Sequence, residues 1–159
     1  MITIQRFKAA EQEEIKEFVL NIQNNEFHLG LTEDDQMDLR NIADYFLDGG
    51  FWTAKIDGKI VGTIGLQYLN DDNAALKKMF VNKDFRGKEL GIAQMLFDTL
   101  LDFAKDKNLK NIWLDTPSVA NASHRFYERN GFVLSKKANL PDEYSFPDRN
   151  SKVYKLITI

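Results

Sequence analysis

The apolar residues of this chain change their spacing near residue 82, from every second position to every third or fourth. Before that point, Phe51–Ile56 and Lys59–Tyr68 alternate in polarity and flank Asp57-Gly58, a pair that tolerates the positive φ values of a tight hairpin turn. Alternate residues from Ile60 to Tyr68 are predicted to share one face. With Ala75–Val81, which follows a further polar turn, these segments predict an antiparallel meander.

The second half of the chain alternates helices and strands. Apolar residues at helical spacing predict a long helix from about Ala93 to Ala104, and the pattern then predicts a strand at Asn111–Thr116. A shorter helix follows over residues 120–130. Phe132–Ser135 and Val153–Ile159 are the last predicted strands, joined by a surface loop over residues 136–150.

Residues 2–7 form the first predicted strand, and Ile15 to Ile22 have the spacing of an amphipathic helix. The segment after Thr32 predicts a second helix, with an acidic start suited to the helix dipole and an apolar face that runs from Leu39 through Ala43 to Phe46. A sheet that begins antiparallel and gains crossover helices belongs to the α/β (α+β) class. We expect a mixed, mostly antiparallel, twisted sheet of six to seven strands with helices on both faces.

The length of 159 residues fits one domain, which we assign to residues 1–159. The chain has no cysteine and two histidines at unrelated positions, so a disulfide framework, a catalytic thiol and a zinc site are not expected. A net charge of −3 gives no basic surface for nucleic acid. No long apolar segment or signal peptide is visible, so we expect a cytoplasmic protein that has no membrane contact.

The segment most informative for function lies between the third meander strand and the long helix, and reads Phe85-Arg86-Gly87-Lys88-Glu89-Leu90-Gly91-Ile92-Ala93. Its glycines let successive N–H groups turn toward one point, and the following helix adds unpaired N–H groups and a positive dipole end. Such a turn suits a phosphate, although a tightly packed helix start is the plain alternative. No Walker loop and no dinucleotide fingerprint is present.

Lys88-Glu89-Leu90-Gly91-Ile92-Ala93 resembles the acetyl-CoA signature of the GNAT family of N-acetyltransferases, Gln/Arg-x-x-Gly-x-Gly/Ala, with Lys in the first position. A second match lies downstream. The segment from Asn121 through Tyr127, six residues later, to Gly131-Phe132 is similar to the family's motif of Asn, Ala and Tyr-x-x-x-Gly-Phe, with His124 in place of the Ala. The two motifs occur in the family's order, with a strand between them.

The resemblance implies roles for individual residues. The backbone of Met79-Phe80-Val81 would pair with the pantetheine arm of acetyl-CoA, and Arg86 and Lys88 would be rival side-chain contacts to the phosphates. Asn121 would lie beside the pantetheine, and Tyr127 would be the catalytic acid that protonates the departing CoA thiolate. Backbone N–H groups would hold the diphosphate, from Gly87, Lys88, Glu89, Leu90, Gly91, Ile92 and Ala93.

The acceptor side is less defined, because the strand before the signature lacks the carboxylate that many family members have there. Candidates for acceptor binding or for deprotonation of the amine are Glu26, His28, Asp115, His124 and the 136–150 loop, and water is a further route for the proton. The alternatives are solvated surface residues for Glu26 and His28 and a packed histidine for His124.

The resulting hypothesis is an acetyl-CoA-dependent N-acetyltransferase that acts on a primary amine of a small molecule or peptide. Without cysteine, we expect direct attack of the amine in a ternary complex. A non-catalytic acyl-CoA sensor of the same fold and a generic phosphate-binding protein remain alternatives, and a homodimer, which is common in the family, remains open.

Overall fold

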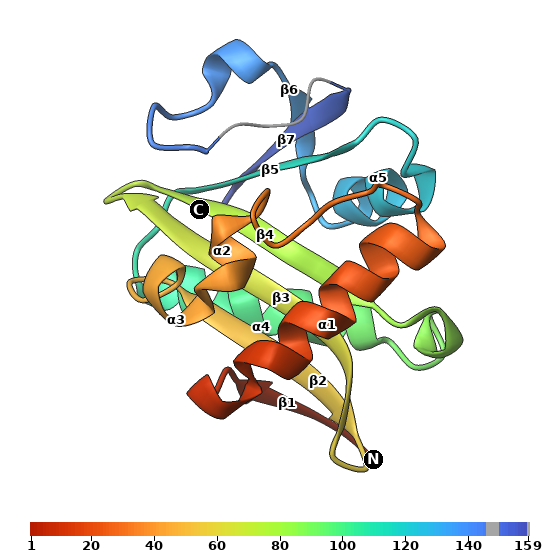
Figure 1. The fold of residues 1–159 in the computed structure, drawn as a ribbon. Coiled ribbons are helices and arrows are strands. Elements are labelled where there is room, and N and C mark those ends of the chain that lie inside the picture. Colours follow the sequence, from red (N-terminus) through yellow and green to blue (C-terminus); the bar gives the residue numbers. More distant parts are fainter. Residues whose placement is uncertain (146–149, 159) are drawn as a thin grey trace. The chain divides into compact units, whose positions relative to one another are not determined.

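The computed structural model describes residues 1–145 and 150–158 (Figure 1). In this part of the chain, seven strands form one sheet in the order β1-β2-β3-β4-β5-β7-β6. The strands are β1 (Ile2–Arg6), β2 (Gly50–Ile56), β3 (Lys59–Asn70), β4 (Asn73–Val81), β5 (Asn111–Pro117), β6 (Val133–Ser135) and β7 (Ser151–Ile157). The predicted class, a mostly antiparallel mixed sheet with helices, is confirmed.

The helices are α1 (Gln12–Asn21), α2 (Met37–Arg40), α3 (Ile42–Tyr45), α4 (Ile92–Asp106) and α5 (Asn121–Arg129). A π-helical turn, Ile22–Glu26, continues α1, and short 3-10 turns cover Ala9–Glu11, Lys83–Phe85 and Lys137–Asn139. The last strand was predicted to reach Ile159, which lies outside the described residues.

The chain divides into two compact units. Unit 1 comprises Met1–Gln67 and Lys77–Phe103, and unit 2 comprises Tyr68–Leu76 and Ala104–Ile159. The assignment of residues 1–159 to one domain stays a prediction.

In unit 1, the hairpin between β2 and β3 turns at Asp57 and Gly58, which have φ values of 50° and 78°. The turn chemistry predicted for this pair is therefore confirmed. The prediction that Ile60 and Gly62 share a face is wrong, because the pairing register shifts opposite Ala54 and Lys55. An extra residue in β3 makes a bulge there, which interrupts the alternation of side chains.

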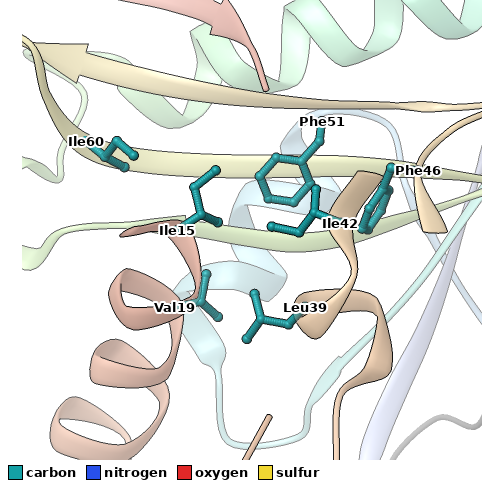
Figure 2. Packing of buried hydrophobic residues seen from close by; sticks show 7 residues of the cluster. All are labelled: Ile15, Val19, Leu39, Ile42, Phe46, Phe51 and Ile60. Atoms are coloured by element: carbon teal, nitrogen blue, oxygen red, sulfur yellow. The ribbon is translucent and has the colours of Figure 1, made fainter. Parts of the chain in front are cut away.

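Because of the bulge, Ile60 and Gly62 of β3 face opposite sides of the sheet in unit 1. Ile60 packs into a buried apolar cluster beneath α1, α2 and α3 (Figure 2). A Cβ added at Gly62 would instead meet Leu96 and Ile92 of α4. Helices therefore cover both faces of the sheet in this unit. The cluster consists of Ile15, Val19, Leu39, Ile42, Phe46, Phe51 and Ile60.

The helix predicted after Thr32 is wrong in extent, since the structure has two single turns, α2 and α3, separated at Asn41. The acidic segment before them is not helical. Asp35 accepts hydrogen bonds from the backbone N–H and the hydroxyl of Thr32, a local turn that competes with helix formation. Ala43, predicted on the apolar face, is exposed because the break at Asn41 rotates α3 relative to α2.

In unit 2, β5 pairs along its whole length with β7 in antiparallel orientation, and β7 pairs with β6. The start of β4 pairs in parallel with β5, but only over Asn73–Ala75 with Asn111–Trp113. Trp113 and Tyr144 belong to the apolar cluster of this unit.

Candidate functional site

The loop from Asn82 to Gly91 connects β4 to α4 in unit 1. Gly87 and Gly91 have φ values of 116° and 66°, a region that L side chains rarely adopt, and a Cβ at Gly87 would meet nothing within 4 Å. The N–H of Gly91 donates to the carbonyl of Gly87 over 3.1 Å and closes the turn. Glycine is therefore required here by the backbone conformation, with open space around it, and not by tight packing at Gly87.

The same loop leaves backbone donors unused. Within residues 1–145 and 150–158, the N–H groups of Lys88, Glu89, Leu90 and Ile92 have no hydrogen-bond partner. The first turn of α4 contains no acidic residue that would compete for them. Unpaired N–H groups at the positive end of a 15-residue helix form an arrangement that attracts an anion.

Gly62 allows α4 to begin close to the sheet. A Cβ at this position would lie 3.0 Å from Cδ1 of Leu96, 3.2 Å from the carbonyl oxygen of Phe80 and 3.3 Å from Cγ2 of Ile92. These distances are shorter than ordinary van der Waals contact. The close approach of β3 and α4 fixes the helix end that presents the loop.

Arg86 is occupied by partners within the protein. Its Nε donates to the carbonyl of Val81 over 2.8 Å, and its two terminal nitrogens bind both carboxylate oxygens of Glu26, one of them over 2.7 Å. Its guanidinium also lies 5.8 Å from the ring centre of Phe27. Lys88, the rival phosphate contact, is exposed and has no side-chain partner among the described residues.

Two predicted acceptor residues of unit 1, Glu26 and His28, differ in environment. Glu26 ends the π-helical turn, binds Arg86 and lines a polar surface pocket of about 270 Å³ together with Asn82 and Asp84. His28 is exposed, with a φ of 54°. The structure therefore places Glu26 in an ion pair and His28 at the surface.

Tyr127 lies in α5 of unit 2 and is only 7% exposed. Its ring packs at 5.8 Å from Phe126, 5.6 Å from Phe132 and 6.2 Å from Tyr154, measured between ring centres. Burial raises the pKa of the Tyr127 phenol well above its usual value, and the charge of Asp115 raises it further. The phenol therefore keeps its proton throughout the neutral range. Asn121 is the exposed first residue of the same helix.

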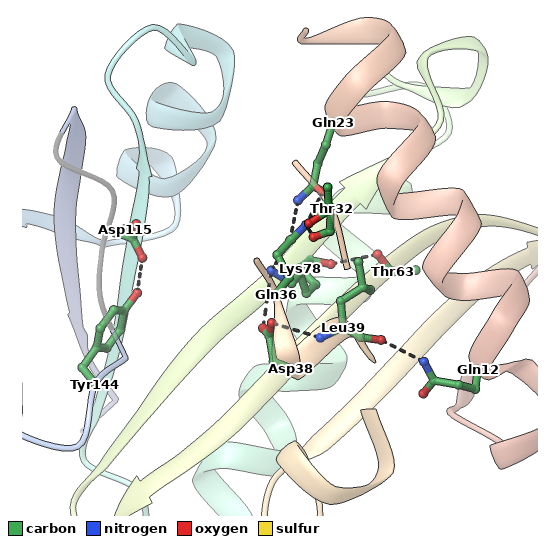
Figure 3. A network of polar contacts seen from close by, with 10 residues as sticks. All are labelled: Gln12, Gln23, Thr32, Gln36, Asp38, Leu39, Thr63, Lys78, Asp115 and Tyr144. Carbon is green, nitrogen blue, oxygen red and sulfur yellow. Dashed lines mark hydrogen bonds and ion pairs between the residues drawn. The ribbon is translucent and has the colours of Figure 1, made fainter. Parts of the chain in front are cut away.

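Two other candidates of unit 2 are held by their neighbours. His124 is 5% exposed, and its Nε2 lies 2.9 Å from the carbonyl oxygen of Pro117. This contact favours the packed-histidine alternative. Asp115 accepts a hydrogen bond from the hydroxyl of Tyr144, so the part of the 136–150 loop that is described is tied to β5 (Figure 3). Burial and the Asp115 charge raise the pKa of Tyr144.

A polar network that was not predicted from the sequence surrounds Lys78 in β4 of unit 1 (Figure 3). Lys78 has a φ of 52° within a strand, and its ammonium donates to Gln36 over 2.6 Å. Asp38 lies 3.4 Å from the same ammonium, and Gln23 exchanges two hydrogen bonds of 2.8 Å with Gln36. The signal in the sequence that points to this network is the pair of lysines, Lys77 and Lys78, among the apolar residues of β4.

Residues 1–145 and 150–158 contain no group of three or more histidine, cysteine or acidic side chains arranged to hold a metal ion. They also contain no helix with the length and apolar content needed to cross a bilayer.

A model of the Acetyltransferase (GNAT) family matches residues 15–132. A probable N-acetyltransferase camello of Xenopus tropicalis is 35% identical over 74% of this chain, and an N-acetylaspartate synthetase of Danio rerio is 33% identical over 69%. The chain spans 55% and 39% of the lengths of these two relatives.

Among solved structures, a GNAT-family acetyltransferase of Staphylococcus aureus Mu50 is 37% identical, with a TM-score of 0.94 and full coverage of both chains. An N-acetylglutamate synthase of Neisseria gonorrhoeae complexed with coenzyme A and N-acetyl-glutamate has a TM-score of 0.75 at 16% identity. That match covers the whole of this chain and 35% of the Neisseria chain. Because the identity is only 16%, the likeness concerns the fold alone.

Proposed function

Because the chain belongs to the acetyltransferase (GNAT) family, we propose that it transfers the acetyl group of acetyl-CoA to a primary amine of a small molecule or an exposed amino group. The reaction is direct attack of the amine on the thioester in a ternary complex. The observation that supports this most is the loop between β4 and α4, with its two positive-φ glycines and unpaired N–H groups. Its chemistry suits the diphosphate of coenzyme A.

In this proposal the diphosphate binds backbone N–H groups of the segment from Gly87 to Ala93, chiefly the unpaired ones of Lys88, Glu89, Leu90 and Ile92. Lys88 makes the main side-chain contact, because its ammonium is available, while the fork of Arg86 already binds Glu26 and Val81. Arg86 then holds the loop in place.

The pantetheine arm lies along the end of β4 at Met79, Phe80 and Val81. The ladder between β4 and β5 covers Asn73–Ala75, and the arm would follow β4 beyond it as an extended chain whose amides pair with a strand. Asn121 contributes a side-chain contact to the cofactor.

Tyr127 acts as the general acid for the thiolate. The raised pKa keeps the Tyr127 phenol protonated until the thiolate forms. Exclusion of water also raises the proton affinity of the thiolate, so the proton affinities of both groups rise together. Proton transfer from a buried phenol to a buried thiolate therefore stays feasible.

An acyl-CoA sensor without transferase activity is the second candidate, favoured by the absence of a carboxylate on β4. Calorimetry with coenzyme A and release of free CoA thiol from acetyl-CoA over a panel of amines separate the two. Binding with amine-dependent release supports the enzyme, binding without release supports the sensor, and no binding removes both.

A further inference from the structure

We propose that Lys78 and Asp38 form a recognition pair for an acceptor that carries both an ammonium and a carboxylate group, so that the acceptor is an amino acid. The inference deepens the proposed function and rests on it. The carboxylate of the acceptor binds the ammonium of Lys78, and the ammonium of the acceptor, before it loses its proton, binds Asp38.

The first support is the looseness of this ion pair. The side chains of Lys78 and Asp38 are only 14% and 17% exposed, yet the closest charged atoms are 3.4 Å apart, beyond normal hydrogen-bond length. Lys55 and Glu11 are buried to a similar degree, 16% and 10%, and are in close contact. A charge pair with little exposure is stabilised by close contact, so a pair that stays apart keeps capacity for a ligand.

The second support is the number of hydrogen bonds that remain available. The ammonium of Lys78 has three donors, and one of them is used in the 2.6 Å bond to Gln36. The carboxylate of Asp38 accepts the N–H of Leu39 over 3.0 Å and otherwise has only the long contact to Lys78. Both groups therefore have unused hydrogen-bonding capacity and partial access to solvent.

The third support is the rigidity of the surroundings. Gln36 is 7% exposed and Gln23 is 4% exposed, and the paired amides fix each other while the oxygen of Gln36 faces the ammonium. The carbonyl of Lys78 accepts the hydroxyl of Thr63 over 2.8 Å, which anchors the strand where φ is positive. Strain held by surrounding contacts is common at functional sites.

The position along β4 agrees with this role. A cofactor whose diphosphate binds the loop after Val81, and whose arm runs back along β4, brings its thioester toward Lys78. The acceptor amine must reach that thioester, so a residue that binds the acceptor belongs at this end of the strand.

The test measures acetyl transfer from acetyl-CoA to each common amino acid and to the amine that lacks its carboxylate. Alanine and ethylamine are one such pair. We expect the wild-type protein to acetylate at least one amino acid with a kcat/KM about tenfold or more above that of its amine, the size of a charge-assisted hydrogen bond. Lys78→Met should abolish this preference through the KM for the acceptor, Lys78→Arg should restore part of it, and Asp38→Asn should weaken both substrates alike.

Lys55→Met is the matched control, because it removes an ammonium of similar exposure from an ion pair in close contact, the pair with Glu11. It should lower the melting temperature and leave the preference unchanged. Equal kcat/KM for amino acids and amines, or a preference that survives in Lys78→Met, overturns the inference and leaves the transferase intact.

If no acceptor is acetylated, the proposed function fails by itself. Calorimetry of the same amino acids with the CoA-saturated protein then decides the inference separately. Binding that Lys78→Met weakens about tenfold supports it, and no binding, or equal binding by the variant, overturns it.

Discussion

Arg86 and Lys88 lie two positions apart and carry the same charge, but their surroundings give them different tasks. Arg86 binds a carboxylate with both terminal nitrogens and a carbonyl with its Nε, which uses its planar fork fully. Lys88 has no such partner among the described residues. Sequence spacing alone left these two residues as equivalent rivals, because the position of Glu26 became known only from the fold.

Lys88→Ala should therefore raise the Kd for coenzyme A about tenfold, the loss expected for one charge-assisted hydrogen bond, and should reduce the salt dependence of binding. Arg86→Gln should chiefly lower the melting temperature, because it breaks the contact with Glu26. Calorimetry at two salt concentrations and thermal unfolding measure both. A larger loss of affinity in Arg86→Gln than in Lys88→Ala would reverse the assignment.

Tyr127→Phe should lower kcat about 10²-fold or more, the contribution of a general acid, and leave the Kd for coenzyme A unchanged. The phenyl ring keeps the packing with Phe126 and Phe132, so the fold should persist. Tyr154→Phe is the control, since it removes another buried hydroxyl, one that donates to Glu128. Unchanged turnover in Tyr127→Phe would exclude the residue from the chemistry.

At the scale of elements, the sequence predicted most of the strands and helices, because long segments with a clear period determine their own type. It failed where local bonds competed with the period. The turn made by Thr32 and Asp35 stops the predicted helix from starting there, and a one-residue bulge changes the faces of β3 between Ile60 and Gly62. Neither this turn nor this bulge changes the spacing of apolar residues in the sequence.

The candidate site was predictable to a similar extent. The loop glycines and Tyr127 stand in motifs and were named from the sequence, although their roles remain proposals. The contacts of Lys78 were not predictable, because its partners Gln36 and Asp38 lie about forty positions away and only tertiary packing joins them. Long-range polar contacts carry no periodic signal.

Gly62→Ala should reduce the free energy of unfolding by about 1–3 kcal/mol, the usual cost of overpacking. The added methyl group meets Leu96 and a backbone oxygen, so α4 must move and coenzyme A binding should weaken too. Chemical denaturation and calorimetry measure the two effects. Gly58→Ala strains only the hairpin turn and should leave the affinity unchanged, so equal affinity in both variants would contradict the role of Gly62.

At the scale of the whole molecule, cofactor binding should stabilise the folded chain. Coenzyme A at about 100 times its Kd adds about 2.7 kcal/mol, which corresponds to a rise in Tm of about 5–10 °C for a chain of this size. Inorganic phosphate at the same concentration should give a much smaller rise. An equal rise with phosphate would favour a generic phosphate-binding protein.

The buried tyrosines should make the protein sensitive to alkali. Burial and the hydrogen bond to Glu128 raise the pKa of Tyr154 to about 12, while an unfolded tyrosine titrates near 10. A group whose pKa is raised on folding stabilises the protein fully below pH 10 and loses that contribution as the pH rises from about 10 to 12. Unfolding titrations should show this decline, and Tyr154→Phe should make it shallower.

The extra residue in β3 also determines which shortening of this hairpin the sheet can accept. Removing Val61 would restore simple alternation along the strand and keep Ile60 on the side of Ile15, because Ile60 and Gly62 already face opposite sides. Removing one residue between Gly62 and Leu66 would instead reverse the faces of the residues on one side of the deletion, so we expect a one-residue deletion to be accepted at Val61 and rejected further along the strand.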